Sequence, residues 1–176
     1  MKEMIVVSAV GRDQPGVAHS VTAAIRRCGG EIAESRMTSL GAEFAMLLLV
    51  SGNWHALAKV ESELDKLSQR DALSVNVRRT SERPIRDNQI PYLIDVICIR
   101  QSDVVEGIAG FFAQRKIDIA ELSTHSYAAA HTGSPMLSVQ LTVSIPADTS
   151  IAALREEFLD FCDGKNLDAV IEPIKN

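Results

Sequence analysis

The sequence lacks the features that mark several large classes of protein. Its 176 residues contain three cysteines, and no apolar run approaches the 18 residues that a membrane-spanning helix needs. Cys28, Cys98 and Cys162 are odd in number and widely spaced, so we expect buried hydrophobic residues rather than disulfides or metal ligands. No charged and apolar leader precedes the first strand-like segment. We therefore expect a cytoplasmic protein that does not interact with membranes.

Signatures of catalysis are also missing. The sequence has no GxSxG, P-loop or GxGxxG motif, and its Ser, Cys and Lys residues have no evident activating base. The four histidines, which are His19, His55, His125 and His131, show no metal-ligand spacing. We therefore predict a protein that is not an enzyme and has no cofactor and no metal.

A basic surface is lacking as well. The formal net charge is −5, and the one basic stretch, from Arg78 to Arg86, is interpreted as a solvated junction. The predicted central strands offer aliphatic residues and only Phe44 and Tyr92 as aromatics, too few for an RNA-recognition sheet that stacks bases. We expect no direct contact with nucleic acid.

The sequence does contain an internal repeat. Residues 4–40 align without a gap on residues 91–127, and Glu31-Ile32-Ala33-Glu34 falls on Asp118-Ile119-Ala120-Glu121. The repeat predicts two domains, 1–80 and 92–176, joined by a linker at 81–91 that contains two prolines.

Each repeat shows the same order of patterns. Apolar strand-like runs alternate with helical spacing, as in Val17, Val21, Ala24 and Ile25, or Leu57, Val60, Leu64 and Leu67. The order is βαββαβ, which predicts an α+β, ferredoxin-like fold with an antiparallel sheet and both helices on one face. Trp54 begins the second predicted helix, where we expect it to anchor packing.

One predicted strand of the first repeat is apolar on both faces. Phe44, Met46, Leu48 and Val50 should face the helices, which leaves Ala45, Leu47 and Leu49 on the open face. The first and third strands are neighbours in this fold, so Val6 and Val10 join Leu47 and Leu49 there. We predict that these four residues bind a protein partner or a second copy, unless the chain's own linker or tail covers them.

The repeats differ most at the turn after their first strand. The first has Asp13-Gln14-Pro15-Gly16, whereas the second has Arg100-Gln101-Ser102-Asp103. A helix N-terminus offers unpaired N–H groups to a carboxylate, and glycine lets a ligand approach the backbone. Asp13 could cap the helix or bind a ligand's ammonium group, whereas the same residues also form an ordinary tight turn.

With these patterns, the chain resembles a tandem ACT-domain protein of the glycine cleavage system transcriptional repressor family. The matching residues are Asp13-x-Pro15-Gly16, Glu34-Ser35-Arg36, Leu40-Gly41-x-Glu43-Phe44, Ser51-Gly52-x-Trp54 and Ile119-Ala120-Glu121-Leu122. The resemblance covers essentially the whole chain and implies two ACT-type domains paired side by side.

The resemblance also implies a function. It places an amino acid such as glycine between two segments, Arg12, Asp13, Gln14, Pro15, Gly16, Val17 and Ala18 of one repeat and Asp118, Ile119, Ala120 and Glu121 of the other. It further implies repression of glycine cleavage genes through a LysR-type activator rather than through DNA. The alternative is a regulatory subunit, or an amino-acid-sensing partner, of a metabolic enzyme.

Overall fold

The chain folds into two compact units, Met1–Pro84 and Ile85–Asn176. The computed structural model describes residues 3–82 and 88–174. Within these residues, no helix is both long and apolar enough to cross a membrane. Each unit has the predicted βαββαβ order and is described by itself.

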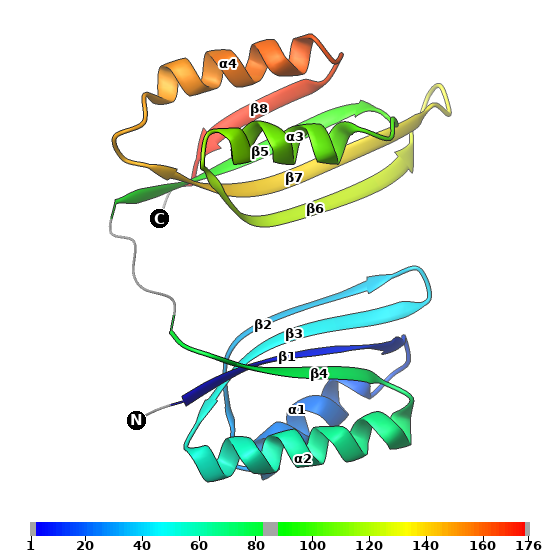
Figure 1. Cartoon of the computed structure of the whole chain (residues 1–176). Coiled ribbons are helices and arrows are strands. Elements are labelled where there is room, and N and C mark those ends of the chain that lie inside the picture. The colour runs from blue at the N-terminus through cyan, green and yellow to red at the C-terminus, as the bar shows by residue number, and fades with distance from the viewer. Residues whose placement is uncertain (1–2, 83–87, 175–176) are drawn as a thin grey trace. The chain divides into compact units, whose positions relative to one another are not determined.

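Unit 1 is a four-stranded antiparallel sheet with two helices on one face (Figure 1). The sheet order is β2-β3-β1-β4, so the first and third strands are neighbours as predicted. The elements are β1 Glu3–Arg12, α1 Val17–Arg27, β2 Glu31–Leu40, β3 Glu43–Gly52, α2 Trp54–Asp71 and β4 Ser74–Thr80.

Unit 2 repeats this architecture, with the sheet order β6-β7-β5-β8. Its helices again lie together on one face of the sheet (Figure 1). The elements are β5 Gln89–Ile99, α3 Val104–Gln114, β6 Asp118–Ala128, β7 Pro135–Pro146, α4 Ile151–Asp163 and β8 Asp168–Pro173. The predicted fold class is thus confirmed for both repeats.

The core of unit 1 lies between its sheet and helices, where the sequence patterns placed it. All eight residues that the helical spacing selected, from Val17 to Leu67, are buried, and so are Phe44, Met46, Leu48 and Val50 of β3. Burying one such side chain contributes roughly 1.5–3 kcal/mol. Asn53 caps α2, since its side chain accepts a hydrogen bond from the Ala56 N–H at 2.8 Å.

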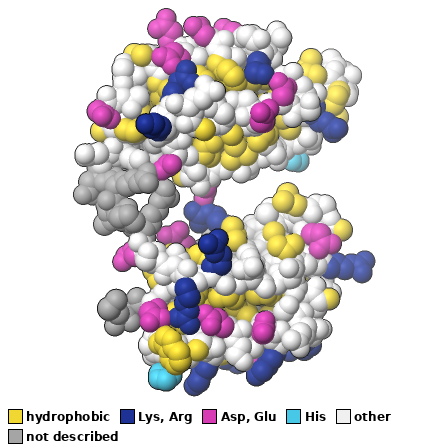
Figure 2. Space-filling model, viewed as in Figure 1, with side chains coloured by type: hydrophobic (Ala, Val, Ile, Leu, Met, Phe, Trp, Pro, Cys, Tyr) yellow, Lys and Arg dark blue, Asp and Glu magenta, His cyan; other side chains and the backbone are white. Residues whose placement is uncertain are grey.

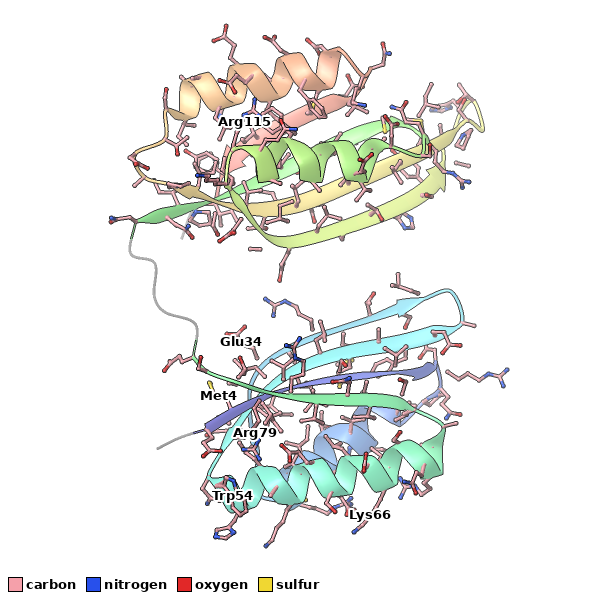
Figure 3. All side chains as sticks on the ribbon, viewed as in Figure 1. Met4, Glu34, Trp54, Lys66, Arg79 and Arg115 are labelled. Atoms are coloured by element: carbon pink, nitrogen blue, oxygen red, sulfur yellow. The ribbon has the colours of Figure 1, made fainter. Side chains whose placement is uncertain are left out.

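The core of unit 2 is richer in aromatic residues. Four of the chain's five phenylalanines, which are Phe111, Phe112, Phe158 and Phe161, pack α3 against α4 with ring centroids 5.1–6.3 Å apart. Arg115 lies over the Phe111 ring at 3.7 Å and donates to Glu157 (Figure 3). The contact between the two helices therefore combines packed aromatic rings with an ion pair at its edge.

Two details differ from the sequence predictions. β5 begins at Gln89, inside the predicted linker 81–91, because Pro91 is compatible with the strand. The Pro91 carbonyl accepts from the Ile174 N–H, so its missing N–H lies on the β8 side. The rest of the predicted linker includes residues 83–87, which lie outside the described residues. Trp54 was expected to anchor packing, but its side chain is 59% exposed at the start of α2 (Figure 3).

Both repeats contain a β-bulge that the pattern of the sequence did not indicate. The register of β2 against β3 shifts between Ile32 and Glu34, and that of β6 against β7 shifts between Ile119 and Glu121. The extra residues, Ala33 and Ala120, occupy equivalent positions. Bulges often redirect side chains next to binding sites.

Candidate functional site

The predicted ligand turn of unit 1 connects β1 to α1. Arg12 ends β1, and Asp13, Gln14, Pro15 and Gly16 are all exposed. The Asp13 N–H donates to the Ala42 carbonyl at 2.9 Å, which ties the turn to the β2–β3 hairpin. The turn is thus held by its backbone, while its side chains remain accessible.

Gly16 has the conformation that makes glycine necessary. It is the N-cap residue of α1 with φ of 97°, in the left-handed region where other residues are strained. A Cβ at this position would have no heavy atom within 4 Å, so the space beside the backbone is open. The residue therefore provides both a sharp turn and room for a ligand.

The N-terminal end of α1 carries no compensating negative charge. No side chain caps this end of the helix, and its first turn contains no acidic residue. Asp13 therefore does not cap α1, so the second interpretation of Asp13, as a group for a ligand's ammonium, stays a prediction. Helix N–H groups and the helix dipole favour an anion at such a terminus. This end of α1 is suited to a ligand carboxylate.

The remaining predicted residues of this segment take different positions. Val17 is only 6% exposed and belongs to the core, so its backbone alone could contact a ligand. Ala18 is half-buried and packs against the same core. His19 is exposed beside a cavity of about 760 Å³ that Arg26 and Ile32 also line.

In the equivalent turn of unit 2, side chains of the turn bond to a residue of the α4–β8 turn. Asp103 is the N-cap residue of α3, with φ of −102° instead of a positive value. Its carboxylate lies 2.7 Å from Lys165 Nζ, and Gln101 Nε2 donates to the Lys165 carbonyl. Glu106 adds a second acidic group to the first turn of α3. The two turns therefore differ in backbone conformation at the N-cap residue, and only the α3 helix start carries acidic side chains at its N-cap and in its first turn.

The second half of the predicted site lies on β6. Asp118 and Ile119 are half-buried, whereas Ala120 and Glu121 are exposed. Ile119 packs against the core of unit 2, and the register of β6 against β7 shifts at Ala120, next to Glu121. The pairing of these residues with the turn of unit 1 stays a prediction.

The predicted partner surface lies on the sheet of unit 1, on the face opposite the helices. This apolar sheet face consists of Val6, Val10, Ala45, Leu47 and Leu49; Val10 is 43% exposed and Leu47 is 53% exposed. Figure 2 shows hydrophobic side chains gathered between charged ones on both units. In unit 2 the corresponding positions of β7 are Ser138, Gln140 and Thr142, and Gln140 Nε2 donates to Asp95 Oδ1 at 2.8 Å. The third strand of unit 1 is thus apolar on its open face, whereas the equivalent strand of unit 2 is polar there, although Ile97 of β5 is also exposed.

Little in the described residues suggests catalysis. Among residues 3–82 and 88–174, no group of three or more His, Cys, Asp or Glu side chains could hold a metal ion. The thiols of Cys98 and Cys162 are buried, which raises the pKa of both, for Cys162 to about 11. A thiol with a raised pKa is a poor nucleophile at neutral pH. Cys28 is half-buried.

Sequence reasoning missed Lys165 and the bulges. Lys165 is 62 residues from Asp103 and lies in the α4–β8 turn, so no local motif connects them. The available signal was the repeat itself: Asp103 replaces Gly16, and a carboxylate at a helix N-terminus attracts a cation.

Comparisons with known proteins agree with this architecture. The family model of the ACT domain matches residues 3–78. The chain is 28% identical over 170 residues to the glycine cleavage system transcriptional repressor of Escherichia coli K12, covering 97% of this chain and 90% of the relative.

Two solved structures match over the whole chain. One is described provisionally as a glycine cleavage system transcriptional repressor: it is 27% identical, has a TM-score of 0.77, and is matched over 100% of this chain and 99% of its own. The other, a protein of unknown role from Galdieria sulphuraria, is 22% identical with a TM-score of 0.80, covers 99% and 100%, and supports the fold alone. Residues 3–78 thus match the ACT-domain family model, and the chain as a whole has the tandem ACT fold and resembles the glycine cleavage system transcriptional repressors.

Proposed function

We propose that this chain is a non-enzymatic regulator that binds a small amino acid at the β1–α1 turn. The observation that carries the proposal is the open, positively polarised N-terminus of α1 beside Gly16, with no acid in its first turn. Its backbone N–H groups would bind the ligand carboxylate. The exposed Asp13 carboxylate would bind the ligand's ammonium group.

The ligand we favour is glycine. Backbone groups and one carboxylate recognise the two charged ends of an amino acid and require no side chain. The resemblance to glycine cleavage system transcriptional repressors supports the same choice. In the proposed site, Asp118, Ile119, Ala120 and Glu121 of β6 form the second wall, as the resemblance implies.

The regulated process would be expression of glycine cleavage genes. We propose that the chain acts in the cytoplasm through a protein partner such as a LysR-type activator, and does not contact DNA. The net charge of −5 disfavours binding to a polyanion. The apolar sheet face around Val6, Val10, Leu47 and Leu49 would bind the partner or a second copy.

Linkage gives the regulation its logic. If the ligand and the partner each bind one of two conformations of the chain more tightly than the other, each changes the affinity of the other by the same factor. Ligand binding at the turn would therefore shift partner binding, and partner binding would shift ligand affinity equally.

Calorimetric titration of the full chain with each of the common amino acids tests the proposal. We expect saturable heat with glycine, weaker binding as the side chain grows, and a changed affinity when the partner is present. Absence of binding by every amino acid would contradict the proposal. Binding that changes the activity of a metabolic enzyme, with no effect on an activator, would favour the alternative of an enzyme's regulatory subunit.

A further inference from the structure

One ion pair distinguishes the helix-start turns of the two units. Lys165 Nζ lies 2.7 Å from Asp103 Oδ2, and the Gln101 side-chain amide donates to the Lys165 carbonyl at 3.2 Å. These bonds join the β5–α3 turn to the α4–β8 turn. The Lys165 ammonium also lies 5.9 Å from the centre of the Phe161 ring, which helps to fix its position.

Unit 1 has neither member of this pair. The α2–β4 and α4–β8 turns each contain a residue with positive φ, Ala72 at 52° and Asn166 at 55°, which fixes their alignment. Asp71 therefore stands at the position of Lys165, and its carboxylate is bound by Arg70 Nε at 2.7 Å. Gly16 stands at the position of Asp103.

A carboxylate is therefore already present at the N-terminus of α3. The hydrogen bond from Lys165 lowers the pKa of Asp103, and a backbone hydrogen bond lowers it further, so the group stays ionised. Together with Glu106, it supplies the negative charge that this helix end favours. A second carboxylate would be repelled and would find Lys165 occupied.

We propose that the Asp103–Lys165 ion pair takes the place of a ligand carboxylate in unit 2 and so leaves the chain with a single amino-acid site. The single site of unit 1 rests on the function proposed above. The closure of unit 2 does not, and it is tested separately. With a single site, the chain would respond to the ligand over one concentration range, with no second, weaker site.

The direct test replaces Asp103 with glycine in the full chain. Asp103→Gly removes the carboxylate, leaves Lys165 unpaired, and gives α3 the N-cap residue that α1 has. Acetate is the probe, because it carries a carboxylate without an ammonium group that Lys165 would repel. Amide resonances of residues 103–107 are followed by NMR during the titration.

We expect saturable acetate-dependent shifts at these amides in Asp103→Gly, with a Kd at least about tenfold below any in the unaltered chain. The control is Asp160→Asn, which removes the same charge from exposed α4 without touching Lys165. It should behave as the unaltered chain does. Equal acetate responses in all three proteins would overturn the proposal.

Glycine titration of the unaltered chain separates this proposal from the proposed function. One site supports both, and two sites would overturn the closure of unit 2 while leaving the function intact. No glycine binding would overturn the proposed function, and the acetate difference would still decide the closure.

A second variant covers the case in which Asp103→Gly does not fold. In Lys165→Met the chain keeps its backbone and the stem of the side chain, but the ammonium is lost. We expect the pKa of Asp103, measured by NMR of its carboxyl carbon, to rise toward its ordinary value. An unchanged pKa would show that Lys165 does not hold the carboxylate and would overturn the proposal.

Discussion

Val6 on β1 lies directly opposite Leu49 on β3, and both side chains are on the sheet face that the helices of unit 1 do not cover. Their counterparts in unit 2 are Leu93 and Thr142. The same backbone positions therefore form a largely apolar face in one repeat and a mixed one in the other. This divergence at matched positions is the reason that we propose partner binding for unit 1.

We predict that Leu47→Asp weakens binding of the partner, or of a second copy, by at least about tenfold, since a buried apolar contact becomes a charge. The side chain is 53% exposed in the chain, so unfolding free energy should change by less than about 0.5 kcal/mol. Sedimentation and partner capture measure association, and urea unfolding measures stability. Thr142→Asp, on the open face of unit 2, is the control. Unchanged association in Leu47→Asp would contradict the assignment of this face.

Gly30 and Gly110 should respond to alanine with opposite signs. A Cβ at Gly30 would lie 2.9 Å from Ile25 Cγ2 and 3.0 Å from Val50 Cγ1, so Gly30→Ala should destabilise the chain by about 1–3 kcal/mol. Gly110 lies inside α3 with no atom within 4 Å of that position. Gly110→Ala should stabilise by about 0.5–1 kcal/mol. Urea unfolding measures the change in unfolding free energy for both variants. Equal changes would contradict the close packing around Gly30.

Gly16→Ala should cost stability and ligand affinity, whereas Gly133→Ala should cost stability only. Both glycines have positive φ, 97° and 69°, and open space around a new Cβ. Each substitution should therefore destabilise by about 1–2 kcal/mol through backbone strain. Only Gly16 adjoins the proposed site, so calorimetry with glycine should separate the two variants. A similar loss of affinity in both would point to a general effect of strain.

The three thiols should differ in reactivity. Cys98 and Cys162 are 3% and 1% exposed, and burial raises the pKa of each, while Cys28 is half-buried. At pH 8 we expect one thiol to react readily with a disulfide reagent and three to react in urea. Rapid labelling of Cys162 in the folded chain would contradict its burial.

The raised pKa of Cys162 also determines how the stability of the chain changes with pH. The pKa of Cys162 is raised to about 11, so the folded chain keeps a proton that the unfolded chain releases at lower pH. Its contribution to stability is complete below the ordinary thiol pKa of about 8.5 and is lost as pH rises toward 11. Cys162→Ala should flatten the loss of unfolding free energy over this range.

The fold could be predicted from the sequence because its signals are periodic and duplicated. The helical spacings from Val17 to Ile25 and from Leu57 to Leu67 both reflect burial on one face, and the structure confirms them. Trp54 was misjudged because size alone suggested packing, whereas the first position of α2 faces solvent.

The candidate site could be predicted only in part. Gly16 was singled out because the two repeats differ at this turn, and the structure adds that its φ is positive. The Asp103–Lys165 pair joins turns that are distant in sequence, and the bulge at Ala120 depends on the register of two strands. The repeat alone could point to Asp103, but neither its partner Lys165 nor the bulge leaves a pattern that a single sequence can show.

The central claim is that an amino acid binds at the N-terminus of α1. The most direct test is an NMR titration of the full chain with glycine, which follows the backbone amides of residues 13–19 and 100–106. The account predicts saturable shifts in the first group, largest near Gly16, and small ones in the second. Saturable shifts only in the second group, or none in either, would contradict it.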